Sequence, residues 1–524
     1  MRRFICTLAA ALAASWAAAA PASAETVLRV SLHSDLKIVD PIWTTALIST
    51  HYGNMVYDTL FSLDADLKPQ PQMVDKYDVS ADKLTWTFTL RDGLEWHDGK
   101  PVTAEDCVAS IKRWGVKDSM GQKLMSEVKE LTAPDAKTIK MVLKEPYGLV
   151  LDSLGKAASN IAFMMPKRVA DTDPNTQITD YTGSGPFIFK KDEWKPGEKA
   201  VFVKNPKYKP RSEPPSGLAG GKVAKVDRVE WITIPDQQTQ VNALLNGEID
   251  MIEIVPPDLL PLLQKDKNVK VVVVNKAGRQ YDMRFNVLHK PFDNAKIREA
   301  VLYALDQKPF VEANVGNPDY YKLCKSVFPC GSPLETTKGW EDKLSGNVAK
   351  AKQLLKEASY DGTPIVLRHQ TDIAGHNQLA TVAKPQLEAA GFKVDLQAMD
   401  WQTLVSRRTK KEPLDKGGWS AFFTSWGSPD IMNPVSAAFI NASCDKAPFG
   451  WPCDATIEKL RDAYAKEPDP AKQKAIAEQV SVRLSGAYPT FAPLGQFTTP
   501  TAIRSNISGL LSVPELALWN VEKK

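Results

Sequence analysis

An alternating run of apolar and polar residues, closed by a tight turn, constrains the fold of this chain more than any other feature. From Leu84 to Leu90 large apolar side chains alternate with threonines, so one face of a strand is apolar and the other polar. Arg91–Gly93 turns the chain, and Leu94–His97 is expected to form a second short strand. The pattern therefore predicts a half-buried pair of short strands.

A capped helix is expected directly after these strands. Thr103, with Asp106 three residues later, forms a capping box, which marks the first turn of a helix. This helix places four residues on one buried side: Cys107, Val108, Ile111 and Trp114.

Helical and strand patterns alternate along the rest of the chain. Gln237–Leu245, Ala295–Leu305 and Asn377–Ala390 predict helices, and Val269–Val274 is a continuous apolar run, expected to be a fully buried strand. Helices interleaved with strands indicate an α/β fold class. About 500 mature residues exceed what one hydrophobic core supports, so at least two lobes are expected.

The amino terminus has the pattern of a secretion signal. Two arginines precede the apolar stretch Phe4–Ala20, and Ala22–Ala24 forms an A-x-A cleavage site. We expect residues 1–24 to be removed, the mature chain to begin at Glu25, and the protein to reside in the periplasm. The apolar stretch is too short and too rich in alanine for a membrane anchor. Loss of two arginines lowers the formal net charge from +4 to about +2, and no block of Lys and Arg indicates nucleic-acid binding.

Five cysteines follow the cleavage site. Cys324 and Cys330 lie close together, as do Cys444 and Cys453, and both pairs stand in loops of an exported protein, so two short-range disulfides are expected. Zinc binding is the weaker alternative, because neither pair has C-x-x-C spacing and no histidine stands nearby. Cys107 is expected to be a buried free thiol.

Several long segments resemble one family. They include LRDGLEWHDGKPVTAEDC from Leu90, YTGSGPFIFKKDEW from Tyr181, ALLNGEIDM from Ala243 and RFNVLHKPFDNAKIREAVLYALD from Arg284. These segments resemble the solute-binding proteins of bacterial ABC importers, in the peptide/nickel/opine family (extracellular solute-binding family 5), of the dipeptide- or oligopeptide-binding type.

The resemblance implies a two-lobed periplasmic binding protein fold of type II, in the large peptide-binding class with an extra subdomain and a ligand cleft between the lobes. By this analogy residues 25–278 and 498–524 form lobe one, with the extra subdomain, and residues 279–497 form lobe two. The implied partners are a peptide or other small-molecule ligand and the membrane permease of an ABC importer, and the protein is expected to be a monomer.

The same resemblance implies an acidic residue that pairs with the amino terminus of a bound peptide. In peptide-binding members this aspartate stands three residues before a D-P, E-P or similar step; Asn433-Pro434 is that step here, and Asp430 stands three residues before it. A tryptophan usually precedes the aspartate by three residues, whereas Trp426 precedes it by four, so either the loop has one extra residue or the tryptophan is displaced. The alternative for Asp430 is a turn residue next to Pro429, and the alternative for Trp401 and Trp426 is the core of a lobe.

Trp401 and Arg408 complete the implied site. Asp400-Trp401 resembles an acid-Trp step whose tryptophan forms part of the pocket wall in the family, and Arg408, seven residues later, occupies the position of an arginine near the ligand carboxylate in some oligopeptide binders. A solvated basic helix end, which includes Arg407, is the alternative. An arginine common in dipeptide binders has no counterpart at Gln370–Asp372, so an opine, a sugar conjugate or a nickel complex remains an alternative ligand.

Motifs for catalysis or cofactor binding are missing from the sequence. Gly183-Ser184-Gly185 is followed by proline and reads as a turn rather than a G-x-S-x-G elbow. There is no H-E-x-x-H motif and no phosphate-binding loop, and the spacing of His369 and His376 is weak evidence for metal. We therefore expect no enzyme, no cofactor and no metal site, with a secreted hydrolase as the least favoured alternative.

Overall fold

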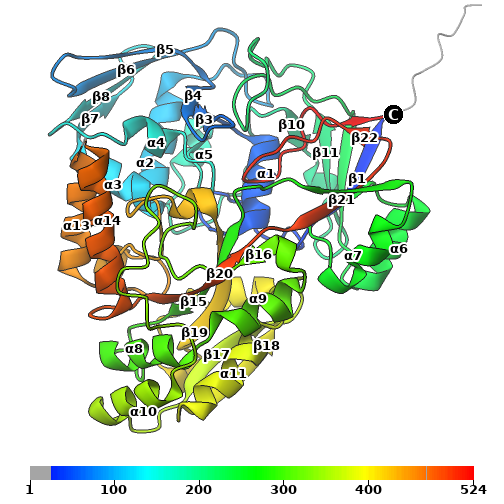
Figure 1. Ribbon diagram of the computed structural model, residues 1–524. Coiled ribbons are helices and arrows are strands. Elements are labelled where there is room, and N and C mark those ends of the chain that lie inside the picture. The colour runs from blue at the N-terminus through cyan, green and yellow to red at the C-terminus, as the bar shows by residue number, and fades with distance from the viewer. Residues whose placement is uncertain (1–24, 468) are drawn as a thin grey trace, which may run out of the picture.

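Three sheets organise the chain, and each lies in a different part of the molecule (Figure 1). The structure, a computed structural model, describes residues 25–467 and 469–524, so the predicted signal at residues 1–24 lies outside the described residues. Helices and strands alternate along the chain, which confirms the α/β fold class.

The largest sheet has seven strands and lies on the right in Figure 1. Its strand order is β10 (Phe187–Phe189), β11 (Lys199–Lys204), β12 (Arg228–Ile232), β1 (Val27–Ser31), β13 (Met251–Ile252), β21 (Pro500–Arg504) and β14 (Val269–Val273). The central strand β1 runs parallel to both of its neighbours. Helices α6 (Gln237–Asn246) and α7 (Leu260–Gln264) lie beside this sheet (Figure 1).

A six-stranded sheet forms the lower part of the molecule in Figure 1. Its strand order is β16 (Tyr321–Lys322), β20 (Phe491–Phe497), β15 (Arg279–Phe285), β19 (Ala421–Gly427), β17 (Ile365–Gln370) and β18 (Val394–Met399). The helices of this region are α8 (Ala295–Ala304), α9 (Gln307–Val315), α10 (Val348–Glu357), α11 (Leu379–Ala389) and α12 (Trp401–Arg407).

The third sheet contains the segment that resembles the family most clearly. Its order is β5 (Val74–Val79), β6 (Thr85–Leu90), β8 (Thr138–Leu143) and β7 (Val128–Thr132). Thr103 and Asp106 form the expected capping box at the start of α2 (Ala104–Lys117), and the four residues expected to be buried on this helix are buried.

The remaining elements connect these layers. The short strand pairs are β2 (Asp58–Thr59) with β9 (Phe163–Met164), β3 (Phe61–Leu63) with β4 (Pro69–Pro71), and β22 (Ile507–Ser508) with β23 (Glu522–Lys523). The remaining helices are α1 (Leu47–Val56), α3 (Ser119–Glu127), α4 (Val150–Leu154), α5 (Lys167–Ala170), α13 (Ala455–Lys466) and α14 (Pro470–Ser485). Over the described ranges, no helix combines the length and apolar character needed to cross a membrane.

The chain passes twice between the seven-stranded and the six-stranded sheet. The first passage joins β14 to β15, and the second joins β20 to β21 only a few residues before the carboxyl-terminal segment. Helix α1 lies near the middle of the molecule in Figure 1, and Ile48–Val56 are buried. The start of β15 lies beside the end of β19, where Arg279 pairs with Gly427.

Two expectations about strands are wrong. Leu94–His97 is not a strand: it makes a single bridge, between Glu95 and Pro101, because the backbone N–H of His97 donates to the carbonyl of Gly183 in a distant loop. The run from Val269 is a strand, but it is half-buried rather than fully buried, since β14 is an edge strand that pairs only with β21. An apolar run alone does not tell an edge strand from a central one.

The cysteines are paired as expected. Disulfides join Cys324 to Cys330 and Cys444 to Cys453. Cys107 is a buried free thiol in α2, and burial raises the pKa of this thiol well above its ordinary value.

Candidate ligand-binding site

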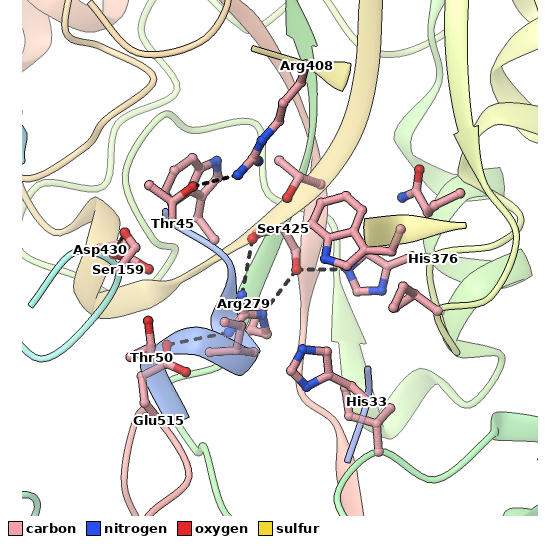
Figure 2. A pocket seen from close by; sticks show the side chains of 17 residues that line it. His33, Thr45, Thr50, Ser159, Arg279, His376, Arg408, Ser425, Asp430 and Glu515 are labelled. Carbon is pink, nitrogen blue, oxygen red and sulfur yellow. Dashed lines mark hydrogen bonds and ion pairs between the residues drawn. The ribbon is translucent and has the colours of Figure 1, made fainter. Parts of the chain in front are cut away.

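A cavity lies between the amino-terminal part of the chain and the six-stranded sheet (Figure 2). The part of the chain before β15, together with the carboxyl-terminal segment, contributes one group of lining residues, which includes His33, Thr45, Thr50, Ser159 and Glu515. The part from β15 to β20 contributes the other group, which includes Arg279, Gln370, His376, Trp401, Arg408, Ser425, Trp426 and Asp430. All four residues predicted from the sequence, Asp430, Trp401, Trp426 and Arg408, therefore line one cavity.

Asp430 is a buried carboxylate with little compensation. It lies in a short 3-10 turn, Ser428–Ile431, and its side chain accepts a 2.8 Å hydrogen bond from the hydroxyl of Ser159. Within the described residues no cationic nitrogen lies within 4.0 Å of it, because the nearby Lys156 pairs with Asp118 instead. Burial raises the pKa of Asp430 to about 6, although the charge of Lys156 acts in the opposite direction. A cationic ligand group would relieve this cost.

Arg408 is a buried cation with no counter-ion among the described residues. Its guanidinium donates a 2.9 Å hydrogen bond to the hydroxyl of Thr45, while its Nε has no hydrogen-bond partner in the part of the chain that the structure describes. The guanidinium carbon lies 4.7 Å from the centre of the Phe449 ring and 5.8 Å from that of Trp401. Burial lowers the pKa of Arg408 to about 10, so the side chain stays charged at neutral pH. Such an arginine can bind a ligand carboxylate.

The two arginines at this helix end have different environments. Arg408 directly follows α12, whose first turn is capped by Asp400, and it turns into the cavity, whereas Arg407 is exposed. The alternative of a solvated basic helix end therefore applies to Arg407 and not to Arg408.

Trp401 and Trp426 form parts of the cavity wall. Both side chains are half-buried and pack against the main hydrophobic core. The indole N–H of Trp426 donates a 3.0 Å hydrogen bond to Asp282, which fixes the ring in β19 despite the changed spacing to Asp430. An amphipathic ring held in this way can contact apolar parts of a ligand.

The sequence analysis missed a second polar group in the cavity. Arg279 donates from Nε to the hydroxyl oxygen of Ser425 over 3.1 Å, and its Nη1 lies 3.5 Å from Glu515 (Figure 2). The Ser425 hydroxyl also lies 2.8 Å from Nε2 of His376. Burial, with the charge of Arg279, lowers the pKa of His376 to about 3, so its imidazole is neutral and Nε2 accepts a hydrogen bond from the hydroxyl. Ser425 and His376 thus orient the side chain of Arg279.

One of these missed residues has a signal in the sequence. Glu515 is an acid in the otherwise apolar segment Val513–Trp519, and it is almost fully buried in the structure. Ser159, Thr45 and Arg279 carry no comparable signal, because only the folding of distant segments brings them to the cavity.

The cavity thus presents opposite charges at different places. Figure 2 shows Arg408 and Thr45 on one side, and Asp430, Ser159 and Glu515 on another. Opposite charges held apart, with aromatic rings between or beside them, can bind a small molecule that carries both an ammonium and a carboxylate.

Comparison with known proteins gives a consistent result. Residues 68–447 match the profile described as "Bacterial extracellular solute-binding proteins, family 5 Middle". The chain is 41% identical over 507 residues to a protein of Sinorhizobium fredii named "Probable peptide ABC transporter periplasmic-binding protein y4tO", covering 96% of this chain and 94% of the relative.

Solved structures share the fold. The periplasmic binding protein DppA from Helicobacter pylori, in complex with the peptide STSA, is similar with a TM-score of 0.78 and 21% identity, covering 95% of this chain and 98% of that one. The binding protein AgaA from A. tumefacien R10, in complex with agropinic acid, is similar with a TM-score of 0.78 and 22% identity, covering 95% and 99%. These likenesses confirm the expected fold class.

Proposed function

Because this chain belongs to family 5 of the bacterial extracellular solute-binding proteins, we propose that it captures a short peptide and delivers it to the membrane permease of an ABC importer. The family consists of binding proteins, so the chain is a receptor and not an enzyme. The peptide as ligand agrees with the name of the Sinorhizobium fredii relative.

One observation favours a peptide as the ligand. Asp430 and Arg408 are buried side chains of opposite charge that line the same cavity, and neither forms an ion pair with another described residue. A free peptide brings an ammonium and a carboxylate, so it supplies both missing counter-ions at once. In this role Asp430 binds the amino terminus, Arg408 binds the carboxylate, and Trp401 and Trp426 contact the side chains.

Closure of two lobes around the ligand is part of the proposal. We assign residues 25–278 and 498–524 to one lobe, and residues 279–497 to the other. Two passages of the chain at these limits support the assignment. Hydrogen bonds from Ser159 to Asp430 and from Arg408 to Thr45 would then cross the cleft and hold it closed.

The proposal also includes export and a monomeric state. Residues 1–24 would be removed as a signal, and the mature chain from Glu25 would act in the periplasm as a single copy. Membership of an extracellular family supports this location.

An opine or another hydroxyl-rich conjugate is the second candidate ligand. Thr50 Oγ1 and Gln370 Oε1 line the cavity, and both lack a hydrogen-bond partner in the described part of the chain. Additional polar partners of this kind suit a ligand with several hydroxyl groups, which a simple dipeptide does not have.

Ligand screening on the mature protein tests the choice. The protein is unfolded in denaturant to remove any bound ligand, refolded, and heated with dipeptides, tripeptides, tetrapeptides and opines. We expect at least one free peptide to raise Tm and to bind in calorimetry, whereas its N-acetylated, C-amidated form does neither. Stabilisation by an opine alone would reject the peptide and favour the second candidate.

A further inference from the structure

Two histidines and two glutamates form a buried cluster at one wall of the cavity. His33 follows β1, His51 lies in α1, Glu253 follows β13, and Glu515 belongs to the carboxyl-terminal segment. Their side chains are between 2% and 10% exposed. His33 and Glu515 line the cavity (Figure 2), so the cluster reaches its surface.

One carboxylate of this cluster faces both imidazoles. Nδ1 of His33 lies 2.8 Å from Oε2 of Glu253, and Nδ1 of His51 lies 3.6 Å from Oε1 of the same carboxylate. Nitrogen and oxygen atoms of all three side chains lie within 4.8 Å of one another. Three potential metal ligands from distant parts of the chain therefore converge on one point.

One ring nitrogen of His51 lacks a hydrogen-bond partner among the described residues. It is 2% exposed, and its Nδ1 has no hydrogen-bond partner among residues 25–467 and 469–524. The 3.6 Å separation from Glu253 is too long for a hydrogen bond. A buried ring nitrogen without a partner is unusual and requires an explanation.

The other ring nitrogen of His51 faces a second carboxylate. Nε2 lies 3.7 Å from Oε2 of Glu515, on the opposite edge of the ring from Glu253. Histidines that bind metal commonly have a carboxylate behind the ring, which accepts the other N–H and fixes the tautomer. Glu515 lies on the side of the ring that this role requires, but at 3.7 Å it would have to move closer to accept the N–H.

We propose that His33, His51 and Glu253 bind a divalent transition-metal ion of the zinc or nickel class, and that Glu515 orients His51 for it. Two imidazoles and one carboxylate suit such ions, which bind these ligands at about 2.0–2.2 Å. The ion would give His51 Nδ1 its missing partner and would compensate the charge of the buried Glu253 carboxylate. Because His33 lines the cavity, the ion would lie at the cavity wall.

The sequence alone does not reveal this site. Glu253 stands 220 positions after His33, and the ligands match no motif with fixed spacing, so the search for H-E-x-x-H or paired cysteines does not find them. The inference does not depend on the chemistry of the transported ligand, since all three groups belong to the protein.

Metal titration of the mature protein, purified without a histidine tag and stripped with chelator, tests the site. Zn²⁺ binding is measured by calorimetry and Co²⁺ binding by visible absorption. We expect one ion per chain, and His33→Gln and His51→Gln should each weaken Zn²⁺ binding at least about tenfold. His289→Gln, a histidine whose ring contacts the carbonyl of Lys411 outside the cluster, should bind Zn²⁺ like the wild type.

Two results would overturn the proposal. The first is no Zn²⁺ or Co²⁺ uptake by the wild type, which would leave a hydrogen-bonded ion-pair network only. The second is unchanged affinity in His33→Gln. If His51→Gln fails to fold, His33→Gln at the cavity wall tests the proposal by itself. Zn²⁺ should raise Tm of the wild type and of His289→Gln, but not of His33→Gln.

Discussion

Ser159 donates a hydrogen bond from its hydroxyl to Asp430 Oδ1 across 2.8 Å, although 271 positions separate the two residues in the chain. The bond occupies one oxygen of the carboxylate and leaves the other free for a partner. It is made between two buried residues at the cavity that we assign to different lobes, so it fixes the orientation of Asp430 when the cleft is closed.

Asp430→Asn should weaken binding of the preferred peptide at least about tenfold, because a charge-assisted hydrogen bond contributes about 1.5–3 kcal/mol. Calorimetry with the free and the N-acetylated peptide measures this effect. The acetylated peptide should bind the wild type poorly and lose little more on mutation. Asp75→Asn, at an exposed acid of β5, is the matched control. Equal affinity of wild type and Asp430→Asn would reject ammonium pairing.

The raised pKa of Asp430 predicts a pH dependence with a defined sign. Burial holds the folded-state pKa near 6, above the ordinary value of 3.8, so the folded protein binds more protons between these values. The contribution of Asp430 to ligand-free stability therefore falls as pH rises from about 4 to about 6 and stays low above that. Asp430→Asn should be more stable than wild type at pH 7 and similar at pH 4, as urea unfolding would measure.

Peptide affinity should rise with pH, whereas the contribution of Asp430 to stability falls with pH. An ammonium group needs the ionised carboxylate, so affinity should fall about tenfold per unit of pH below about 6 in the wild type. This dependence should be absent in Asp430→Asn. A flat profile in the wild type would contradict the pairing.

Arg408→Met should abolish the preference for a free carboxylate. Wild type should bind a C-amidated peptide at least about tenfold more weakly than the free acid, whereas the variant should bind both equally. The ligand-free variant should be at least as stable as wild type in thermal unfolding, because it no longer buries an unpaired charge. Arg407→Met, at the exposed neighbour, should change neither property. Retained discrimination in Arg408→Met would assign the carboxylate to another residue.

The disulfide Cys444–Cys453 should influence ligand binding more than Cys324–Cys330 does. The first encloses Phe449, whose ring lies 4.7 Å from the guanidinium of Arg408. Replacing either pair by serines should cost on the order of 2–3 kcal/mol in stability, since both loops are short. Only the pair Cys444→Ser with Cys453→Ser should also weaken peptide binding, as calorimetry below Tm would measure. Equal losses of affinity in both double variants would contradict this role for the loop.

Local patterns predicted many elements of this fold but not their positions within sheets. The capping box of Thr103 and Asp106 depends on residues three apart, and the structure contains it. The strand at Val269 was expected to be fully buried and lies at a sheet edge, because strand order depends on pairing with distant residues. Leu94–His97 makes only a bridge at Glu95, because the backbone N–H of His97 donates to the carbonyl of the distant Gly183.

The residues of the candidate site also fall into two groups, those that could be predicted from the sequence and those that could not. Asp430, Trp401, Trp426 and Arg408 could be predicted through the family resemblance, and all four line one cavity. Ser159, Thr45 and the cluster of His33, His51 and Glu253 could not, since their partners stand far away in the sequence. Burial of Arg408 beside an exposed Arg407 also needed the structure, because the two arginines are neighbours at the end of the same helix.

Identification of the molecule that the exported protein carries tests the central claim most directly. The mature protein is purified from the periplasm without refolding and denatured, and the small molecules released are measured by high-resolution mass spectrometry. We predict a peptide with a free amine and a free carboxylate, present at about one per chain and absent from Asp430→Asn. A released molecule without an amine, or equal amounts from wild type and variant, would contradict the account.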